Sequence, residues 1–228
     1  MISVIISAYK GELYIEQAIR SVLCQLPYDG EIIVCDEKPG GATERIIKRL
    51  AAEDSRIIPV EGKNTGATEN MINAIRYSKG DKIFICSQND VWLPDKIKRV
   101  NEAFSQGADL VLHNAYITDE NLNITDYSFF EAASVRKGII SNISRNSYIG
   151  SLMAFDRRML RFIMPIPKHI PDCDQWIGLI CRIFGTVRLV DAPLSYRRQL
   201  HTDNDNSQDK AKRRYLINKL YKRVITRR

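Results

Sequence analysis

A chain of 228 residues with 44% hydrophobic content is long enough to bury a substantial core within one domain. Its formal net charge of +7 is concentrated at one end: residues 210–228 hold nine Lys or Arg and no acid, which leaves 25 basic and 27 acidic residues elsewhere. A body so close to neutrality argues against a phosphate-tracking groove, and we expect no nucleic-acid partner.

The cysteines favour a reducing compartment, because their number is odd and no two form a C-x-x-C pair. They predict buried thiols, with neither a zinc site nor a disulfide framework. The N-terminus lacks the charged region of a signal peptide, and no apolar run approaches the roughly eighteen residues that span a bilayer. We therefore expect a cytoplasmic protein.

In the first half of the chain, short β-branched runs alternate with segments of helical period, which is typical of βαβ units. Strands are predicted at 2–7, 31–35, 56–60, 82–86 and 109–112. Helices are predicted between them at 12–25, 42–53, 65–78 and 94–104, each opened or closed by Gly, Pro, Asn or a capping residue. The pattern predicts an α/β fold with a doubly wound, mostly parallel central sheet and helices on both faces.

Beyond residue 113 this rhythm breaks. Residues 116–125 predict a hairpin around 119–121, and 126–147 show no period that assigns them to an element. A strand at 148–155, a helix at 174–184, a strand at 187–190 and a polar loop at 202–208 follow. We predict one domain over 1–208 and a basic amphipathic helix over 209–228.

Small polar residues follow the predicted strands, where open parallel sheets bind their ligands. They occur at 7–9, 36–38, 62–66 and 87–90. The sequence contains no Gly-x-Gly-x-x-Gly, P-loop or Gly-x-Ser-x-Gly pattern. Dehydrogenase, NTPase and serine-hydrolase functions therefore lose their main support.

Several of these segments together resemble one family. They are the opening V-I-I-S-A-Y-K-G-E with Y-I-E-Q-A-I after it, the strand ending in Asp36, the N-T-G turn at 64–66, Gly80-Asp81 before a strand, and Q-N-D-V-W-L-P-D-K at 88–96. In order and spacing they are similar to family-2 glycosyltransferases, and W-L-P-x-K resembles bacterial rhamnosyltransferase-like members that act on surface polysaccharides. The resemblance spans about residues 1–205 and implies a GT-A fold and transfer from a nucleotide sugar.

The resemblance implies a nucleotide pocket at the first strand ends. Ser7, Tyr9 and Glu12 would line it, and Asp36 would accept hydrogen bonds from the base. The turn from Asn64 to Gly66 would lie close to the nucleotide. Two ordinary structural roles remain open: Asp36 could cap the next helix, and Tyr9 could simply pack at a strand end.

The resemblance also implies a metal site, since such enzymes carry Asp-x-Asp after a strand to offset charge on the departing diphosphate. Here the segment reads Ser87-Gln88-Asn89-Asp90, which leaves Asp90 as its one carboxylate. Asn89 could still contribute an amide oxygen to Mg²⁺ or Mn²⁺, but with weaker affinity because it adds no charge. Asp90 could alternatively cap the turn before Pro94.

The segment Asp172-Cys173-Asp174-Gln175-Trp176 resembles the family's acidic motif at the start of a helix, and the alignment puts Asp174 at the general-base position. A carboxylate at a helix N-terminus is stabilised as an anion by the helix dipole, which would keep it able to accept a proton. Asp172 is the competing base, and Asp is also a favoured N-cap in any protein.

Further on, Tyr196-Arg-Arg-Gln-Leu-His201 resembles the family's Tyr-Arg-Gln-His segment with a shifted register. His201 would complete the metal shell or contact the diphosphate, beside Arg197 or Arg198. His113, near the expected cleft, and His169, in a Pro-flanked loop, have weaker cases.

In the tail, Leu216, Ile217, Leu220, Tyr221 and Val224 fall on one helical stripe flanked by Lys and Arg. A basic amphipathic helix without acids is typical of a peripheral anchor on an anionic membrane surface. The alternatives are a stripe that packs on the body and a linker to a further segment.

Taken together, these residues predict an inverting glycosyltransferase that moves a sugar from a UDP- or dTDP-sugar to a hydroxyl of a growing, lipid-linked surface glycan at the inner membrane face. The resemblance alone implies that Gly150 and Ser151 would border the acceptor. One rival is a sugar-nucleotide-binding partner subunit without activity, raised by the reduced Asp-x-Asp motif. The other is a sugar nucleotidyltransferase, which should carry a Gly-rich basic loop that is weak here.

Overall fold

The computed structural model describes residues 1–62, 64–136, 138–170, 172–200 and 210–227, and within them one nine-stranded sheet organises the chain. The strand order is β3-β2-β1-β4-β8-β6-β9-β5, with β7 paired to β6. The strands are β1 (Ile2–Ala8), β2 (Glu31–Asp36), β3 (Ile57–Glu61), β4 (Lys82–Ser87), β5 (Val91–Trp92), β6 (Leu110–Thr118), β7 (Ile124–Asp126), β8 (Met153–Asp156) and β9 (Val187–Arg198).

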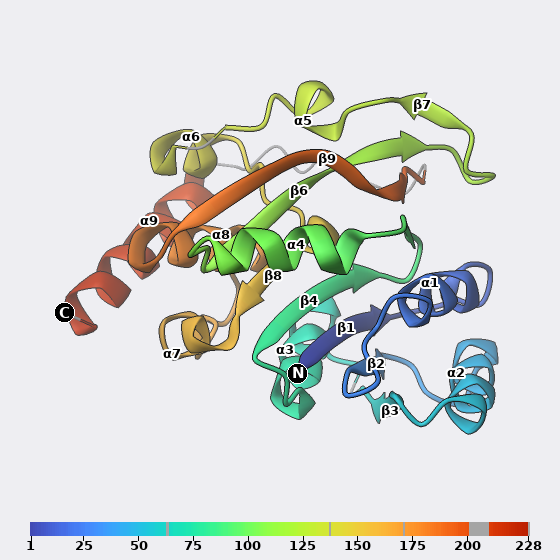
Figure 1. Cartoon of the computed structure of the whole chain (residues 1–228). Helices are drawn as coiled ribbons and strands as arrows, with labels where there is room; N and C mark the ends of the chain where they lie inside the picture. The colour runs from blue at the N-terminus through green and yellow to red at the C-terminus, as the bar shows by residue number, and fades with distance from the viewer. Residues whose placement is uncertain (63, 137, 171, 201–209, 228) are drawn as a thin grey trace.

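The sheet is mixed but mostly parallel in its core, as predicted. Strands β3, β2, β1 and β4 run parallel, as do β6 and β9, whereas β8 lies antiparallel between β4 and β6. In Figure 1 the arrowheads of β1, β4 and β6 all point to the same side of the molecule. The carboxyl ends of strands distant in sequence therefore share one edge, where ligands bind in such sheets.

Helices cover both faces of this sheet, which confirms the predicted fold class. They are α1 (Ile15–Leu23), α2 (Ala42–Glu53), α3 (Ala67–Tyr77), α4 (Lys96–Ser105), α5 (Phe129–Ala132), α6 (Ile139–Ser144), α7 (Leu160–Ile163), α8 (Cys173–Phe184) and α9 (Lys210–Thr226). Two short 3-10 turns, η1 (Gly150–Leu152) and η2 (Arg157–Met159), flank β8. None of the helices among the described residues is both long and apolar enough to cross a membrane.

Alternation along the strands divides the interior into two cores. Ile5 of β1 faces a core shared with α3, α8 and α9, while its neighbours Val4 and Ile6 face a core shared with α1, α2 and α4. Because both faces are buried, the strands carry almost continuous β-branched runs. Four of the five cysteines are buried, and Cys24 is the exposed one.

Two sequence predictions are corrected here. The strand expected at 148–155 exists only from Met153, because the backbone at Gly150–Leu152 forms η1. The strand expected at 187–190 continues to Arg198, since it gains β6 as a parallel partner along its length and β5 near its end. The hairpin predicted at 116–125 is confirmed by the antiparallel pairing of β6 with β7.

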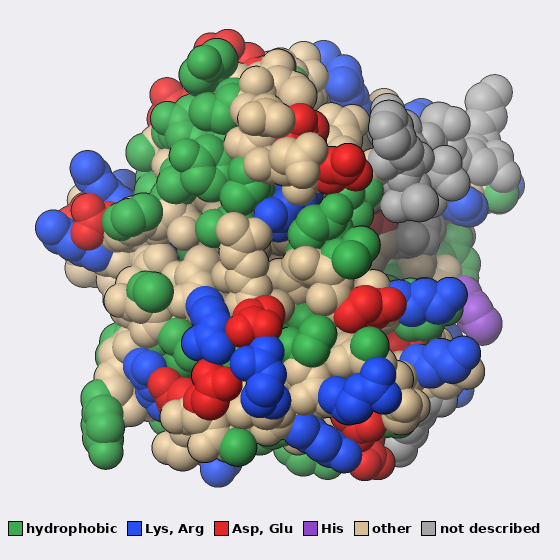
Figure 2. All heavy atoms as spheres, turned by 90° about the vertical axis from the view of Figure 1, so that its right-hand side faces the viewer, with side chains coloured by type: hydrophobic (Ala, Val, Ile, Leu, Met, Phe, Trp, Pro, Cys, Tyr) green, Lys and Arg blue, Asp and Glu red, His purple; other side chains and the backbone are tan. Residues whose placement is uncertain are grey.

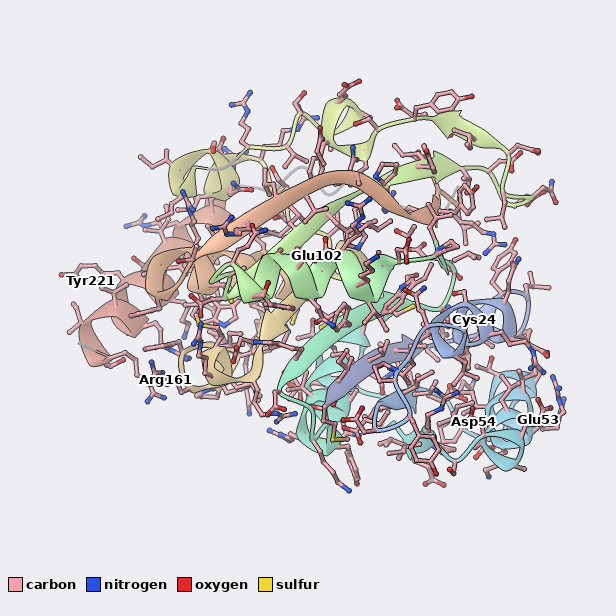
Figure 3. The ribbon with its side chains drawn as sticks, viewed as in Figure 1. Cys24, Glu53, Asp54, Glu102, Arg161 and Tyr221 are labelled. Carbon is pink, nitrogen blue, oxygen red and sulfur yellow. The ribbon has the colours of Figure 1, made fainter. Side chains whose placement is uncertain are left out.

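The apolar stripe that the sequence predicts on the C-terminal helix α9 is only partly buried. Leu216 and Leu220 belong to the core, whereas Ile217 and Tyr221 are 47% and 67% exposed. Arg223 donates to the backbone carbonyls of residues 162, 164 and 165 and so ties the helix to the body. Figure 3 shows the outward direction of Tyr221 at the far end of the molecule. The inner half of the stripe thus packs on the body, and only the outer half remains at the surface.

Candidate active site

A cavity of about 240 Å³ opens at the carboxyl edge of the sheet. Its walls come from β1, β4 and the loop after it, η1, the first turn of α8 and the end of β9. The polar or charged side chains that line it are Ser7, Ser87, Asn89, Asp90, Ser151, Asp174, Arg197 and Arg198. Figure 2 looks onto this side of the molecule, where acidic and basic side chains are interspersed over its lower half.

The two acids at the start of α8 have different positions and partners. Asp172 is the N-cap: its Oδ1 accepts from the backbone N–H groups of Asp174 at 2.9 Å and Gln175 at 3.3 Å. Its Oδ2 accepts from Asn146 Nδ2 at 2.6 Å. Asp174 lines the cavity instead, and its shielded Oδ1 has no hydrogen-bond partner. Asp172 therefore builds the helix terminus, while Asp174 faces the space where a substrate would lie.

Burial sets the electrostatics of Asp174. Removal from water raises the pKa of this carboxyl to about 7, and the neighbouring charge of Asp172 acts in the same direction. A hydrogen bond of 2.7 Å from the Gly150 N–H to Oδ2 lowers the pKa in part. The sequence led us to expect a helix dipole that keeps the group fully ionised; burial outweighs it, which was not visible from the sequence.

Asp90 lines the same cavity, at the end of the loop after β4. It is 2% exposed, and its Oδ2 is shielded from solvent without a hydrogen-bond partner. Burial raises its pKa, while a hydrogen bond from the Ser151 side chain and the nearby charges of Arg197 and Lys96 lower it. An unpartnered carboxylate oxygen suits a bound cation, while the positive charge of Arg197 nearby suits a phosphate.

The residues that could hold a divalent cation are few. Asp90 offers its unpartnered oxygen, and Asn89 lines the same cavity. The described residues contain no cluster of three or more His, Cys, Asp or Glu side chains suited to a metal. Magnesium is nevertheless commonly held by one or two carboxylates together with substrate phosphates and water, so this donor set fits such an ion. The predicted ligand His201 lies outside the described residues.

The two arginines that sequence could not distinguish have separate roles in the fold. The guanidinium of Arg198 points to the α1 side, where it donates to Gln17 and to the backbone carbonyls of Glu120 and Asn89. Its charge also lies 4.4 Å from the centroid of the Tyr14 ring. Arg197, on the other face of β9, lies 5.8 Å from the Phe129 ring centroid and interacts electrostatically with Asp90. Both arginines therefore lie near Asp90: Arg197 through its charge, and Arg198 through a backbone hydrogen bond while its guanidinium is held on the α1 side.

Asn70 of α3, which the sequence reasoning missed, links the predicted nucleotide residue Ser7 to the end of β2. Asn70 Nδ2 donates to Ser7 Oγ at 3.0 Å and to the backbone oxygen of Cys35 at 2.6 Å. This buried amide fixes the ends of β1 and β2 relative to each other. Asp36 follows at the end of β2 with an unpartnered, shielded Oδ2, and burial raises its pKa. It does not cap the next helix, whose N-cap is Gly41.

Tyr9 and Glu12 lie beyond the end of β1, outside the walls of the cavity. The backbone N–H and carbonyl of Tyr9 both bond to the Gln88 side chain at 2.9 Å, and its ring is 44% exposed. Because its ring is this exposed, Tyr9 does not simply pack at the strand end.

Glu12 accepts from Thr43 Oγ1 at 2.8 Å, and hydrogen bonds from its own backbone and from Thr43 lower its pKa.

The predicted turn at 64–66 packs against the loop after β2. Asn64 has a φ of 54° and donates its N–H to the Glu37 backbone oxygen at 3.1 Å. Gly66 has a φ of 98°, which favours glycine, and donates to Glu37 Oε1 at 2.9 Å. The structure thus brings this turn beside Asp36, at one end of the carboxyl edge.

The remaining histidines stay apart from the cavity walls. His113 is fully buried in β6, its Nδ1 lies 2.8 Å from the Asn114 backbone oxygen, and burial lowers its pKa well below the usual value. His169 lies in the loop before α8 with a φ of 59°.

The model of glycosyl transferase family 2 matches residues 3–163, which is more than half of the chain and includes Ser7, Asp36 and Asp90. The chain belongs to glycosyl transferase family 2. Asp174 lies beyond the matched segment. The family membership confirms that the protein is a glycosyltransferase, as the sequence predicts, while the rhamnosyltransferase-like subgroup stays a prediction.

Relatives act in glycan synthesis. A putative teichuronic acid biosynthesis glycosyltransferase of Bacillus subtilis is 24% identical over 95% of this chain and 86% of its own length. A UDP-Glc:alpha-D-GlcNAc-diphosphoundecaprenol beta-1,3-glucosyltransferase of Escherichia coli is 25% identical over 79% and 70%. An uncharacterized glycosyltransferase of Nostoc sp. is 27% identical, and the chain spans 66% of its length.

Solved structures confirm the GT-A fold. The chain resembles S. aureus TarS 1-349 in complex with UDP-GlcNAc with a TM-score of 0.72 and 13% identity, over 99% of this chain and 73% of that one. It resembles a mannosyltransferase of Pyrobaculum calidifontis in complex with GDP-Man and Mn²⁺ with a TM-score of 0.66 and 18% identity, over 89% and 58%.

Proposed function

We propose that this glycosyltransferase moves a sugar from a UDP- or dTDP-sugar, with inversion, to a hydroxyl of a growing lipid-linked surface glycan. One observation carries the proposal. Asp174 and Asp90 line the same cavity at the carboxyl edge of the sheet, and each keeps a shielded oxygen without a hydrogen-bond partner. Inverting transfer needs two groups: a base for the acceptor hydroxyl, and a group that offsets the charge on the leaving diphosphate.

In the proposed reaction, Asp174 accepts the proton of the acceptor hydroxyl while that oxygen attacks the anomeric carbon. The bond from this carbon to the diphosphate breaks, and the nucleoside diphosphate leaves with the electron pair on the opposite face. The pKa of Asp174 near 7 supports its role, because a base works best when its pKa lies close to the working pH. Gly150 and Ser151 line the same cavity and would border the acceptor.

The leaving group would be stabilised from the Asp90 wall. Asp90 and Asn89 would hold Mg²⁺ or Mn²⁺ together with the diphosphate, and the ion would supply positive charge there when bound. His201 remains a predicted further ligand. Arg197 lies near Asp90 and adds a fixed cation. The nucleotide would lie toward β1 and β2, where the unpartnered Asp36 oxygen suits a donor group of the base.

The test is acceptor-dependent release of nucleoside diphosphate by the purified protein. Donors are first chosen by thermal shift with UDP-, dTDP- and GDP-sugars plus Mn²⁺, since binding at 100 times Kd stabilises a fold by about 2.7 kcal/mol. Release that depends on a glycan acceptor and is lost in Asp174→Asn supports the proposal. Donor binding without any release would favour a non-catalytic partner subunit. Formation of a sugar nucleotide from a sugar phosphate and a nucleoside triphosphate would favour the nucleotidyltransferase.

We also propose that the outer face of α9 holds the enzyme at an anionic membrane surface. Ile217, Tyr221 and Ile225 recur every four residues and are 47%, 67% and 57% exposed. Arg214 and Lys222 are exposed on the same helix, which contains no acid in its first turn. Apolar side chains flanked by cations bind the boundary of anionic leaflets, with up to about 1 kcal/mol per Lys or Arg near the surface.

Because Leu216 and Leu220 belong to the core, deleting the helix would unfold part of the body and would test nothing about the membrane. The triple change of Ile217, Tyr221 and Ile225 to Ser removes only exposed groups. We expect it to abolish sedimentation with vesicles of anionic phospholipid while the Tm stays within about 3 °C. A control that changes the exposed Tyr28 to Ser should sediment like wild type. Sedimentation of the triple variant at wild-type level would contradict the membrane proposal.

A further inference from the structure

The first residue of α4, Lys96, occupies an unfavourable position. Its side chain is 1% exposed, and burial lowers its pKa to about 7 because removal from water disfavours the charged amine. A cation at a helix N-terminus also opposes the helix dipole, and the preceding Asp95 has a φ of 66°. Conformations and charges that cost free energy are retained where the surrounding structure enforces them, and such positions cluster at functional sites.

The contacts of Lys96 point to one target. Its Nζ donates to the backbone oxygen of Ser151 at 3.1 Å and lies 4.1 Å from the centroid of the Trp92 ring. Ser151 is the middle residue of η1, the turn that forms the wall of the cavity between the two acids. Lys96 therefore supports this turn from the interior, and its charge also acts on Asp90.

The η1 turn contacts both carboxylates to which we assign a function, Asp174 and Asp90. The Gly150 N–H donates to Asp174 Oδ2 at 2.7 Å, and the Ser151 side chain hydrogen-bonds Asp90. The fit at Gly150 is close, because a Cβ there would lie 2.6 Å from Asp174 Oδ1. A small displacement of the turn would therefore move Asp174 away from the position that this contact defines.

We propose that Lys96 is a positioning residue that holds the Gly150–Leu152 turn, and through it Asp174, at the spacing that transfer requires. The inference rests on the proposed role of Asp174 and assigns Lys96 no contact with substrate. The nucleotide end of the donor is anchored separately, by the parallel strands β1, β2 and β4 and by Asn70. Loss of the Lys96 amine should therefore impair the chemical step far more than donor binding.

The test combines Lys96→Met with Asp174→Asn. Methionine keeps a long apolar stem over Trp92 but cannot donate to Ser151. Because a misplacement of about 1 Å can cost about 10²-fold, we expect kcat to fall between about 10- and 100-fold, while the donor Kd stays within about twofold. In the Asp174→Asn background, where no base remains to be misplaced, the same change should cost less than about threefold. Lys98→Met, on the exposed side of α4, is the matched control and should retain full kcat.

Three results would overturn the proposal: kcat of Lys96→Met within twofold of wild type, an equal loss in both backgrounds, or a donor Kd that rises as much as kcat falls. Lys96→Gln, which keeps a donor group, should recover part of the rate. If both variants unfold, Lys96 supports the domain rather than the base, and the proposal fails. The proposed function is judged separately, on wild type against Asp174→Asn, so its failure cannot be mistaken for this one.

Discussion

Replacing Asp174 by Asn removes the proposed base and little else. The amide is nearly isosteric with the carboxyl, and its oxygen can still accept the Gly150 N–H. Loss of a positioned general base typically costs about 10²–10⁴ in rate. We expect acceptor-dependent turnover to fall by this factor, with the donor Kd within about twofold because the nucleotide side of the edge is unchanged.

The structure also sets the pH dependence of the wild-type rate. With a pKa of about 7, roughly one tenth of Asp174 is ionised at pH 6 and nine tenths at pH 8. Because only the ionised form accepts a proton, kcat should rise about tenfold between pH 6 and pH 8. The residual rate of Asp174→Asn should lack this limb.

The same carboxyl predicts the sign of a stability difference. Its pKa is raised in the folded state, so the protonated form favours folding, and this contribution is present below pH 4 and lost as pH rises toward 7. A change of pKa from 3.8 to about 7 corresponds to about 4 kcal/mol between the two protonation states. The Asn variant carries no such cost, so its stability relative to wild type should grow between pH 4 and pH 7 and then level off.

These expectations are measured by nucleoside diphosphate release with and without acceptor from pH 5.5 to 9, and by urea unfolding of both proteins over the same range and down to pH 4. A variant with near-normal turnover would refute the assignment of the base. A wild-type profile that is flat from pH 6 to pH 8 would refute the environment that we describe for Asp174.

Three further predictions concern residues near Asp174 and in the same cavity. Asp172→Ala leaves the N–H groups at the start of α8 without their cap, so its unfolding free energy should fall by about 1 kcal/mol with a smaller loss of rate than in Asp174→Asn, as urea unfolding and turnover will measure. Gly150→Ala brings a methyl group against the Asp174 carboxylate and should lower kcat about 10- to 100-fold at unchanged donor Kd; unaltered kcat would contradict the close fit. Asn89→Asp adds a charged ligand and should lower the Mn²⁺ concentration for half-maximal activity, whereas full wild-type activity in EDTA would remove the metal from the account.

Much of the fold could be predicted because local and global preferences agree. The helix α2 lies at 42–53 as the apolar period predicts, with Ile47 and Leu50 facing the core. The strands β1 and β2 read as almost continuous β-branched runs because both of their faces are buried. The strand-end rule then predicts that Ser7 and Asp90 share one edge, and both line the cavity.

What escaped prediction depends on contacts between distant segments. Asn70 looks like an ordinary helical residue, and only the fold shows that it joins β1 to β2. The different roles of Asp172 and Asp174 depend on Asn146, which lies in the stretch without any clear period, and on the turn at Gly150, where a strand was predicted. Short helices such as α5 and α6 carry too few residues for a periodic signal.

The tail shows the same limit. An apolar stripe predicts that a helix has a buried side but not what buries it. The body covers Leu216 and Leu220, whereas Ile217 and Tyr221 one position away stay exposed. The expectation of a single membrane-facing stripe was therefore wrong for its inner half, and the proposal now rests on the outer half alone.

The most direct test of the central claim is the configuration of the new glycosidic bond, determined by NMR from the one-bond carbon–hydrogen coupling at the anomeric carbon. Direct displacement by an acceptor oxygen that Asp174 deprotonates must invert the anomeric centre. An α-linked nucleotide sugar should therefore give only a β-linked product. A product that retains the donor's configuration would contradict the proposed role of Asp174 and the assignment of this cavity to a single displacement.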